Sequence, residues 1–237
     1  MAENELFEKI RNRFKSYDII LDDKQVHQFC QYLLLLLDWN EKFNLTAITD
    51  KNEIIDKHFI DSCLPYKVFD EDSQIIDIGS GAGFPSIPLK ILKPTLKMTL
   101  IDSVNKKINF LNEVITKLKL YDIVAFHTRI EDFANKKEYR EKFDYCISRA
   151  LSKMNTLCEY SLPFVKVGGK MVAYKSSGLS DELDVSKNAI ELLGGKFDKI
   201  IDYSFDIFDR KVVVIDKIVN TDKKYPRSKN KPRIQPL

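Results

Sequence analysis

Three glycines at alternate positions are the feature of this sequence that most directly indicates chemistry. They follow an apolar run at residues 74–78 and stand in the order Gly79, Gly81, Gly83, with Phe84 and Pro85 directly behind them. Because glycine has no Cβ, such a loop turns sharply and brings its N–H groups close to a ligand. Pro85 suits the first turn of a helix, where its missing N–H has no partner to lose. Strand, loop and helix in this order predict a nucleotide-type pocket at the carboxyl end of the first strand of an open α/β sheet.

The spacing of the glycines separates the classes of nucleotide cofactor. A dinucleotide site reads G-x-G-x-x-G, whereas this loop reads G-x-G-x-G, and no lysine follows it as in an ATPase phosphate loop. Asp77 stands just before the glycines, and Asp102 closes the next predicted strand. This set resembles motif I of the class I S-adenosylmethionine-dependent methyltransferases, so S-adenosylmethionine is the expected cofactor. A plain tight turn and an oxidoreductase site are the alternatives.

Apolar and amphipathic segments alternate from residue 74 onward. Strand-like runs occupy 74–79, 97–102, 123–127, 143–148 and 170–175. Amphipathic helices are expected at 85–92, 104–119, 131–140, 153–166 and 180–193, with Gly168-Gly169 and Gly194-Gly195 ending two of them. Alternation of this kind predicts a mostly parallel sheet with helices on both faces.

Two further strand-like runs, 196–205 and 210–219, close the folded part of the sequence. Four residues separate them, too few for a crossover helix, so they are expected to form an antiparallel hairpin. The predicted fold is therefore α/β, a class I S-adenosylmethionine-dependent methyltransferase (Rossmann-like) sheet with a C-terminal antiparallel hairpin.

The N-terminal residues have the periodicity of helices. Apolar residues recur at helical spacing over 6–17, and Asp22 with Gln25 forms a capping box for a second helix that runs to about Lys42. Thr49 or Asp50 is the candidate cap of a third helix. The chain is thus divided into a helical unit (1–69) that packs on the sheet and narrows its pocket, a methyltransferase domain (70–220) and a basic tail (221–237).

The ends of the second and third strands supply candidate cofactor contacts. Asp102 lies about 20 residues beyond the glycines, where a carboxylate suits hydrogen bonds to ribose hydroxyls, although it also fits a helix N-cap. Ile130 is placed to flank an adenine ring. Glu131 and Asp132 belong either to that site or to the first turn of a helix, where acids stabilise the dipole.

The end of the fourth strand indicates which atom is methylated. It lacks the Asn/Asp-Pro-Pro-Tyr element that serves exocyclic amines, Cys146 lies inside the strand, and the three histidines are scattered. A nucleophile with a free lone pair, such as guanine N7, needs no general base and depends on alignment. Arg149 at this strand end can donate a fork of hydrogen bonds to a carboxylate, a phosphate or guanine O6, or it can form a structural ion pair.

Several segments together resemble the RsmG (GidB) family of bacterial methyltransferases. They are residues 44–48, 57–62, 76–85, 148–150 and the closing Tyr225-Pro226-Arg227, Pro232 and Pro236-Leu237. The resemblance runs from about residue 38 to the C-terminus. It implies methyl transfer to guanine N7 in a decoding-region loop of 16S rRNA. It also implies that S-adenosylmethionine is lined by Gly79, Phe84, Ile130, Glu131 and Arg149.

The sequence departs from the family pattern at two positions. Ser86 stands where the family has glycine after Phe-Pro, and Asn230 replaces a glycine of the tail. Serine is tolerable in a first helical turn. Asparagine is the non-glycine residue that best tolerates a left-handed conformation, so the turn can survive.

Basic residues indicate how RNA could be held. Six basic residues and no acidic residue lie from Lys223 to Arg233, which predicts an extended, positively charged tail. The tail either attracts RNA phosphates or is simply solvated. It is expected to serve RNA binding and not cofactor binding. Four more are Lys9, Arg11, Arg13 and Lys15. Asn44, the Lys57-His58 pair and Lys175 are candidates for holding the target base, each with an ordinary structural alternative.

Composition limits the remaining function classes. The net charge of +3 alone does not establish a polyanionic partner, and four widely spaced cysteines predict reduced, buried thiols without a metal site. No signal peptide or spanning segment is expected, which predicts a cytoplasmic protein. The family resemblance implies 16S rRNA or the small ribosomal subunit as partner, and a monomer is expected. Alternatives are methylation of another RNA atom or a small molecule, and a module that binds cofactor or RNA without turnover.

Overall fold

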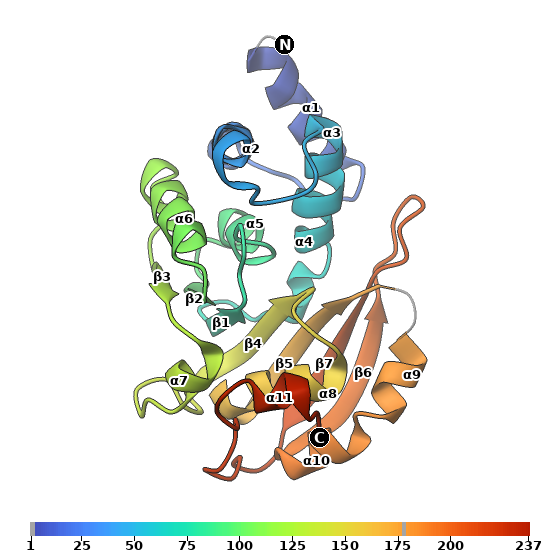
Figure 1. Ribbon diagram of the computed structural model, residues 1–237. Coiled ribbons are helices and arrows are strands. Elements are labelled where there is room, and N and C mark those ends of the chain that lie inside the picture. The colour runs from blue at the N-terminus through green and yellow to red at the C-terminus, as the bar shows by residue number, and fades with distance from the viewer. Residues whose placement is uncertain (1–2, 177–178) are drawn as a thin grey trace.

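A computed structural model describes residues 3–176 and 179–237, and a seven-stranded sheet forms its centre (Figure 1). The strand order is β3-β2-β1-β4-β5-β7-β6. The strands are β1 (Gln74–Ile78), β2 (Lys97–Asp102), β3 (Ile123–His127), β4 (Phe143–Arg149), β5 (Val165–Lys175), β6 (Gly195–Asp202) and β7 (Lys211–Lys217). Each predicted strand is present, so the alternating pattern of the sequence is confirmed.

The last two strands form the predicted antiparallel hairpin. β7 pairs antiparallel with both β5 and β6, and so it inserts between them instead of extending the edge. Among the strands of the described residues, β7 alone runs against the others. The sheet is therefore mostly parallel with one reversed strand, which confirms the predicted fold class.

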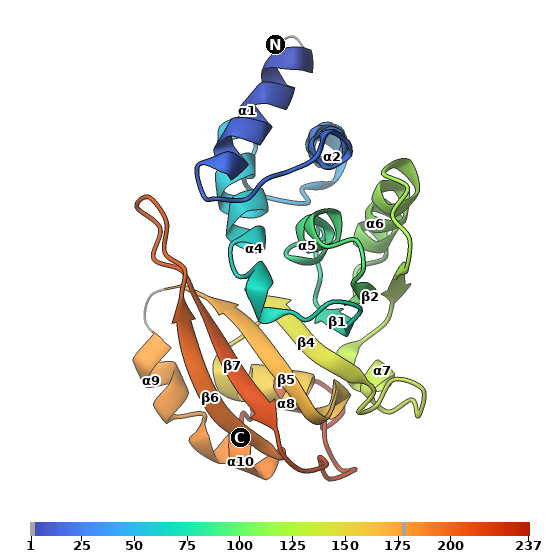
Figure 2. The same cartoon turned by 180° about the vertical axis from the view of Figure 1, so that it is seen from behind.

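Helices cover both faces of the sheet (Figure 2). One face carries α1 (Glu3–Lys15), α2 (Asp23–Phe43), α5 (Ser86–Leu92) and α6 (Asn105–Lys117). The other carries α7 (Ile130–Ala134), α8 (Met154–Ser161), a 3₁₀ turn η3 (Leu162–Phe164), α9 (Leu179–Asp184), α10 (Lys187–Leu192) and α11 (Lys231–Ile234). Within residues 3–176 and 179–237, no helix combines the length and the apolar character needed to cross a bilayer.

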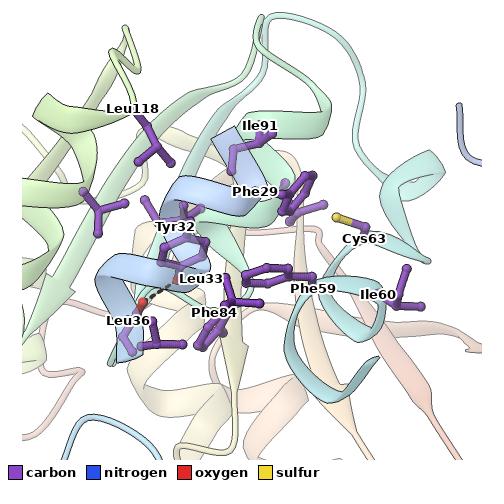
Figure 3. Close-up of a cluster of buried hydrophobic side chains, with 14 of the residues drawn as sticks. Phe29, Tyr32, Leu33, Leu36, Phe59, Ile60, Cys63, Phe84, Ile91 and Leu118 are labelled. Atoms are coloured by element: carbon purple, nitrogen blue, oxygen red, sulfur yellow. Dashed lines mark hydrogen bonds between the residues drawn. The ribbon is translucent and has the colours of Figure 1, made fainter. Parts of the chain in front are cut away.

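Apolar side chains join the N-terminal helices to the sheet domain. The capping box of α2 forms as expected, with the Asp22 carboxylate accepting from the Gln25 N–H at 2.8 Å. Tyr32 of α2 stacks on Phe59 with ring centroids 5.3 Å apart and donates to the Ala82 carbonyl at 2.5 Å (Figure 3). Phe84 from the glycine loop joins this cluster. The loop is thus anchored in the same core as the helical unit.

The third N-terminal helix is continuous but irregular. It begins at the Asp50 cap and runs through α3 (Lys51–Ile54), a π-helical segment η1 (Ile55–Ile60) and α4 (Asp61–Cys63), with a 3₁₀ turn η2 (Tyr66–Val68) beyond. π-Helical turns are uncommon and are often found at functional sites. Here the segment carries Lys57 and His58 to the carboxyl edge of the sheet.

Some predicted elements need correction. Gly168 and Gly169 do not end a helix: α8 is shorter than expected, and both glycines lie in β5 beside a shift in its register with β4. The predicted helix 131–140 is short, ending at Ala134. The predicted helix 180–193 divides into α9 and α10, and its residue 180 carries a side chain outside the described set.

The C-terminal segment is folded, which corrects the expectation of an extended, solvated tail. Tyr225 is buried, and Arg227 forms an ion pair with Glu159 of α8 at 2.6 Å. The Glu159 side chain is fully buried, and a buried carboxylate is stable only with a partner. The composition of the tail gave no sign of this distant partner.

Candidate active site

Two cavities meet at the carboxyl edge of the sheet. The first, about 550 Å³, lies over the ends of β1, β2 and β3, and its walls include Gly79, Asp102, Ile130, Glu131, Asn230 and Arg233. The second, about 460 Å³, lies over the ends of β4 and β5, and its walls include His58, Asp61, Arg149, Lys175, Tyr203 and Arg210. Ala150, directly after β4, belongs to both walls. Ligands in the two cavities would therefore approach each other at Ala150.

The three glycines of the loop have different reasons to be glycine. All three have positive φ angles. A Cβ on Gly79 would lie 2.6 Å from a methyl of Leu151 at the cavity wall, and one on Gly83 would lie 2.6 Å from Ile87 in the core. A Cβ on Gly81 would meet nothing closer than 3.9 Å. Gly79 thus shapes the cavity, Gly83 serves packing, and Gly81 serves the turn.

Asp102 ties the glycine loop to the second strand. Its Oδ2 accepts from the Gly81 N–H at 3.0 Å, and its Oδ1 accepts from the Val104 N–H at 2.9 Å. Lys107 stands 3.7 Å from the same carboxylate, which also faces the first cavity. The predicted helix N-cap role is wrong, because the N-cap of α6 is Val104 and has no side-chain cap bond. The carboxylate still has capacity for the predicted ribose contact, since it can accept up to four hydrogen bonds.

Asp77 is a buried carboxylate with one oxygen that accepts no hydrogen bond from the described residues. Its side chain is 1% exposed; Oδ2 accepts from the Ser86 hydroxyl at 2.5 Å, and Oδ1 has no hydrogen-bond partner among the described residues. Burial raises the pKa of Asp77 to about 7, against the hydrogen bond from Ser86, which lowers it. Ser86, the departure from the family glycine, therefore contributes a partner to this carboxylate.

A second buried carboxylate, Asp61, organises the other cavity. Its Oδ2 accepts from Arg149 Nη1 at 2.8 Å, and its Oδ1 accepts from Arg210 Nε at 3.0 Å and from the Tyr203 hydroxyl at 3.1 Å. The Asp61 side chain is 4% exposed. Three elements far apart in the sequence, namely α4, β4 and the β6–β7 hairpin, are joined at this carboxylate.

His58 is held neutral beside Arg149. Burial and the Arg149 charge lower the pKa of His58 to about 3. Arg149 Nη2 lies 3.0 Å from His58 Nδ1, and Thr46 Oγ1 lies 2.9 Å from Nε2. Nδ1 also lies 3.1 Å from the Lys57 carbonyl, which accepts from Arg149 Nη1. Because a guanidinium can only donate, the contact with Arg149 requires Nδ1 to accept. His58 is therefore neutral and helps to orient Arg149.

Phe84 packs against both His58 and Arg149. Its ring stacks on His58 with centroids 4.2 Å apart, and the Arg149 guanidinium lies 5.1 Å from its centre. A guanidinium over an aromatic face is stabilised by the quadrupole of the ring, whose face has a negative electrostatic potential. Phe84 thus connects the glycine loop to the second cavity.

Lys175 is paired at the rim of the second cavity. Its Nζ lies 2.6 Å from Glu182 Oε2 and donates to the Ser152 carbonyl at 3.1 Å. The charge of each partner is therefore balanced locally.

The predicted site residues divide between these places. Gly79, Asp102, Ile130 and Glu131 line the first cavity, while Arg149 and Lys175 line the second. Asp77, Gly81, Gly83 and Phe84 lie behind these walls. Asn44 lines neither cavity; it is the exposed C-cap of α2, with a left-handed φ of 42°.

Sequence reasoning missed Asp61, Tyr203 and Arg210 as individual site residues. Asp61 stands in the segment 57–62 that carried the family resemblance, and this was the available signal. Arg210 and Tyr203 flank the hairpin tip, and no local pattern marks them. Of the basic N-terminal residues, Arg11 pairs with Asp23 and Arg13 with Asp56, so only Lys9 and Lys15 of that set stay exposed.

The described residues include no cluster of side chains that could bind a metal ion. Within the part of the chain that the structure describes, no three His, Cys, Asp or Glu side chains gather where they could hold a metal ion. All four cysteines are buried and form no disulfide among the described residues, as predicted. Burial raises the pKa of Cys146 and Cys158 well above that of an ordinary thiol.

The fold is shared with solved methyltransferase structures. A SAM-dependent methyltransferase from Aquifex aeolicus superposes with a TM-score of 0.54 at 16% identity, covering 73% of this chain and 96% of that one. M. jannaschii TYW2, solved in complex with AdoMet, gives a TM-score of 0.56 at 16% identity over 73% of this chain and 80% of that one. At this low sequence identity, the structural similarity shows a shared fold and nothing more.

Sequence relatives are much closer. The family model described as GidB, rRNA small subunit methyltransferase G, matches residues 25–208. Proteins named ribosomal RNA small subunit methyltransferase G are 45% identical in Clostridium kluyveri, over 93% of this chain and 94% of theirs, and 43% identical in Clostridium novyi over the full length of both. With this coverage and identity, the chain belongs to the GidB family of small-subunit rRNA methyltransferases.

Proposed function

We propose that this protein transfers a methyl group from S-adenosylmethionine to N7 of a guanine in a decoding-region loop of 16S rRNA. Membership of the GidB family supports the reaction class. The observation that carries the proposal is the pair of cavities meeting at Ala150. Methyl transfer requires donor and acceptor atoms in line and in close approach, and the barrier is lowered by holding them so.

The first cavity suits the methyl donor. S-Adenosylmethionine supplies a methyl group activated by its sulfonium charge. Asp102 can accept hydrogen bonds from the ribose hydroxyls, Ile130 can flank the adenine ring, and Gly79 lets the backbone approach the ligand. The Asp77 oxygen without a hydrogen-bond partner lies behind the loop, and above pH 7, where the carboxylate is ionised, its negative charge favours a cationic ligand.

The second cavity suits a guanine acceptor. Arg149 can donate to guanine O6 and leave the N7 lone pair free for the methyl, and Tyr174 and Tyr203 belong to the same cavity wall. N7 carries a lone pair, so no proton must be removed before it attacks. The carboxylates that line this cavity in the described residues are already neutralised: Asp61 by two arginines, and Glu182 by Lys175. The second cavity therefore offers positive charge and a shaped wall to the guanine, and neither of these carboxylates is free to act as a base.

The RNA around the target base would lie across the helical unit. We assign Asn44 to an RNA contact beside the guanine, because its carboxamide is exposed at the C-terminal end of α2. Exposed Lys9 and Lys15 add positive charge on α1, and phosphate contacts would make affinity fall with salt. The partner is then 16S rRNA or the small ribosomal subunit, which places the reaction in the cytoplasm; a monomer suffices for it.

A transfer assay tests this function. Purified protein is incubated with methyl-labelled S-adenosylmethionine and small subunits whose 16S rRNA lacks the modification, and the RNA is then treated with borohydride and aniline. We expect label in the RNA and cleavage at one guanine, because this chemistry cuts at N7-methylguanosine. Label without cleavage would move the methyl to another atom, and no label would make the protein a binding module.

A further inference from the structure

We propose that the C-terminal segment 225–237 is part of the methyl-donor site, with α11 closing the adenine end of the first cavity through Arg233 and Asn230. The inference rests on the proposed function for the identity of the donor. It replaces the expectation that this basic segment serves RNA alone. Two observations carry it: the segment is fixed on α8, and two of its side chains reach the cavity wall.

The first anchor of the segment is the ion pair of Arg227 with Glu159. Arg227 Nε lies 2.9 Å from Oε1 and Nη2 lies 2.6 Å from Oε2, a forked arrangement of charge-assisted hydrogen bonds. The Arg227 N–H also donates to Oε1 at 2.8 Å. Because the Glu159 carboxylate is fully buried, losing this partner would leave an uncompensated charge in the core.

Further hydrogen bonds hold the chain on either side of that pair. The Thr156 hydroxyl of α8 donates to the Pro232 carbonyl at 2.7 Å, and Arg227 Nη2 donates to the Gln235 carbonyl at 2.8 Å. Before the pair, Arg140 donates to the Tyr225 carbonyl at 2.8 Å. The position of α11 relative to α8 is therefore defined at several points, which a solvated tail would not need.

The cavity side of α11 faces the residues assigned to adenine. Asn230 and Arg233 share the wall with Ile130, Glu131 and Tyr160. The buried Tyr160 hydroxyl lies 3.4 Å from Asn230 Oδ1. Burial and the Glu131 carboxylate raise the pKa of Tyr160, and the nearby Arg233 guanidinium opposes this. These contacts put the Arg233 cation next to the adenine end of the cavity.

The chemistry of Arg233 fits a nucleobase. A guanidinium is planar and weakly hydrated, and it stacks on aromatic faces. The segment also supplies matched controls, since Lys229 and Lys231 are exposed, carry the same charge and do not line the cavity. A role in attracting RNA through charge alone would make all three residues equivalent.

The test is calorimetric titration of the full-length protein with S-adenosylmethionine and, separately, with adenosine. For Arg233→Ala we expect the dissociation constant to rise about tenfold for both ligands, as loss of one stacked guanidinium would give. Lys229→Ala and Lys231→Ala should bind as the wild type does. Arg233→Lys should recover little of the loss, because an ammonium does not stack as a plane.

Two outcomes separate the inference from the function. Wild-type affinity for both ligands in Arg233→Ala, with a folded protein by melting temperature, would overturn the role of α11 while leaving the proposed function intact. Failure of the wild-type protein to bind S-adenosylmethionine would overturn the proposed function and this inference together. Equal losses in Arg233→Ala and Lys231→Ala would also contradict it, since they would indicate charge alone.

Discussion

Arg149 and Asp61 lie 88 residues apart in the sequence and 2.8 Å apart in the fold. The carboxylate of Asp61 also binds Arg210, so a residue of the helical unit fixes one arginine of β4 and one of the β6–β7 loop at the wall of one cavity. Both cations are thus positioned before a substrate arrives. Preorganised groups of this kind lower the cost of alignment during the reaction.

Asp61→Ala is expected to damage both stability and RNA methylation. The substitution leaves two partly buried arginines without their counter-ion, and breaking such a buried pair costs about 3–5 kcal/mol. Thermal unfolding should show the loss. Asp38→Ala is the matched control, because its ion pair with Lys42 is exposed and should change little. If both variants melt at the wild-type temperature, Asp61 does not organise the cavity.

Arg149→Lys is expected to lower kcat for RNA by a factor of about 10²–10³, the usual loss for one preorganised donor. Lysine keeps the charge but cannot reproduce the forked contacts to Asp61, Lys57 and His58. Arg149 lines the second cavity and not the first, so S-adenosylmethionine affinity should change by much less. Equal losses in affinity and turnover would place Arg149 at the donor instead.

The sequence was sufficient for most of the fold because the central strands β1, β2 and β4 are largely buried on both faces. Their mainly apolar runs stand out from the polar residues around them, and β1, β2 and β3 begin where expected. The short link between 196–205 and 210–219 left the hairpin no other topology. Glycine misled the prediction at Gly168-Gly169, because a glycine pair marks an irregular strand as well as a helix end.

The candidate site was less predictable because its contacts are not local. The strand ends carried Gly79, Asp102 and Arg149, and parallel strands bring such ends to one edge. No short pattern reports that Asp61 would be buried between two arginines. Nor does one report that Arg227 would find Glu159, 68 residues away. Partners of this kind are decided by packing of distant elements.

Asp77→Asn is expected to change how stability depends on pH. Burial raises the pKa of Asp77 to about 7 from an ordinary 3.8, so folding favours the protonated form. Its contribution to stability is complete below about pH 4 and is lost as pH rises toward 7, a loss of about 4 kcal/mol at 1.36 kcal/mol per unit. Asparagine does not ionise and should avoid that loss.

Denaturant unfolding of Asp77→Asn at pH 5 and pH 8 measures this difference. The variant should gain stability over the wild type at pH 8, and the gain should shrink at pH 5. At pH 8, where Asp77 is ionised, binding of S-adenosylmethionine should weaken in the variant, since the negative charge behind the loop is gone. A gain that does not vary with pH would mean that Asp77 is not the titrating group.

Gly83→Ala is expected to destabilise the protein more than Gly81→Ala. Both positions have positive φ, but a Cβ on Gly83 would also lie 2.6 Å from Ile87 and 2.9 Å from Leu111. Overpacking of a core costs about 1–3 kcal/mol beyond the backbone strain that the two variants share. Melting temperatures of the two variants give the comparison. Equal shifts would mean that the core accommodates the methyl group without cost.

The most direct test of the two-cavity arrangement is a crystal structure with S-adenosylhomocysteine and guanosine monophosphate bound together. We expect the adenine beside Ile130 and Arg233, the base beside Arg149, and the sulfur pointing past Ala150 toward guanine N7. A sulfur directed away from Ala150, or a homocysteine group lying in the cavity of Arg149, would contradict the account.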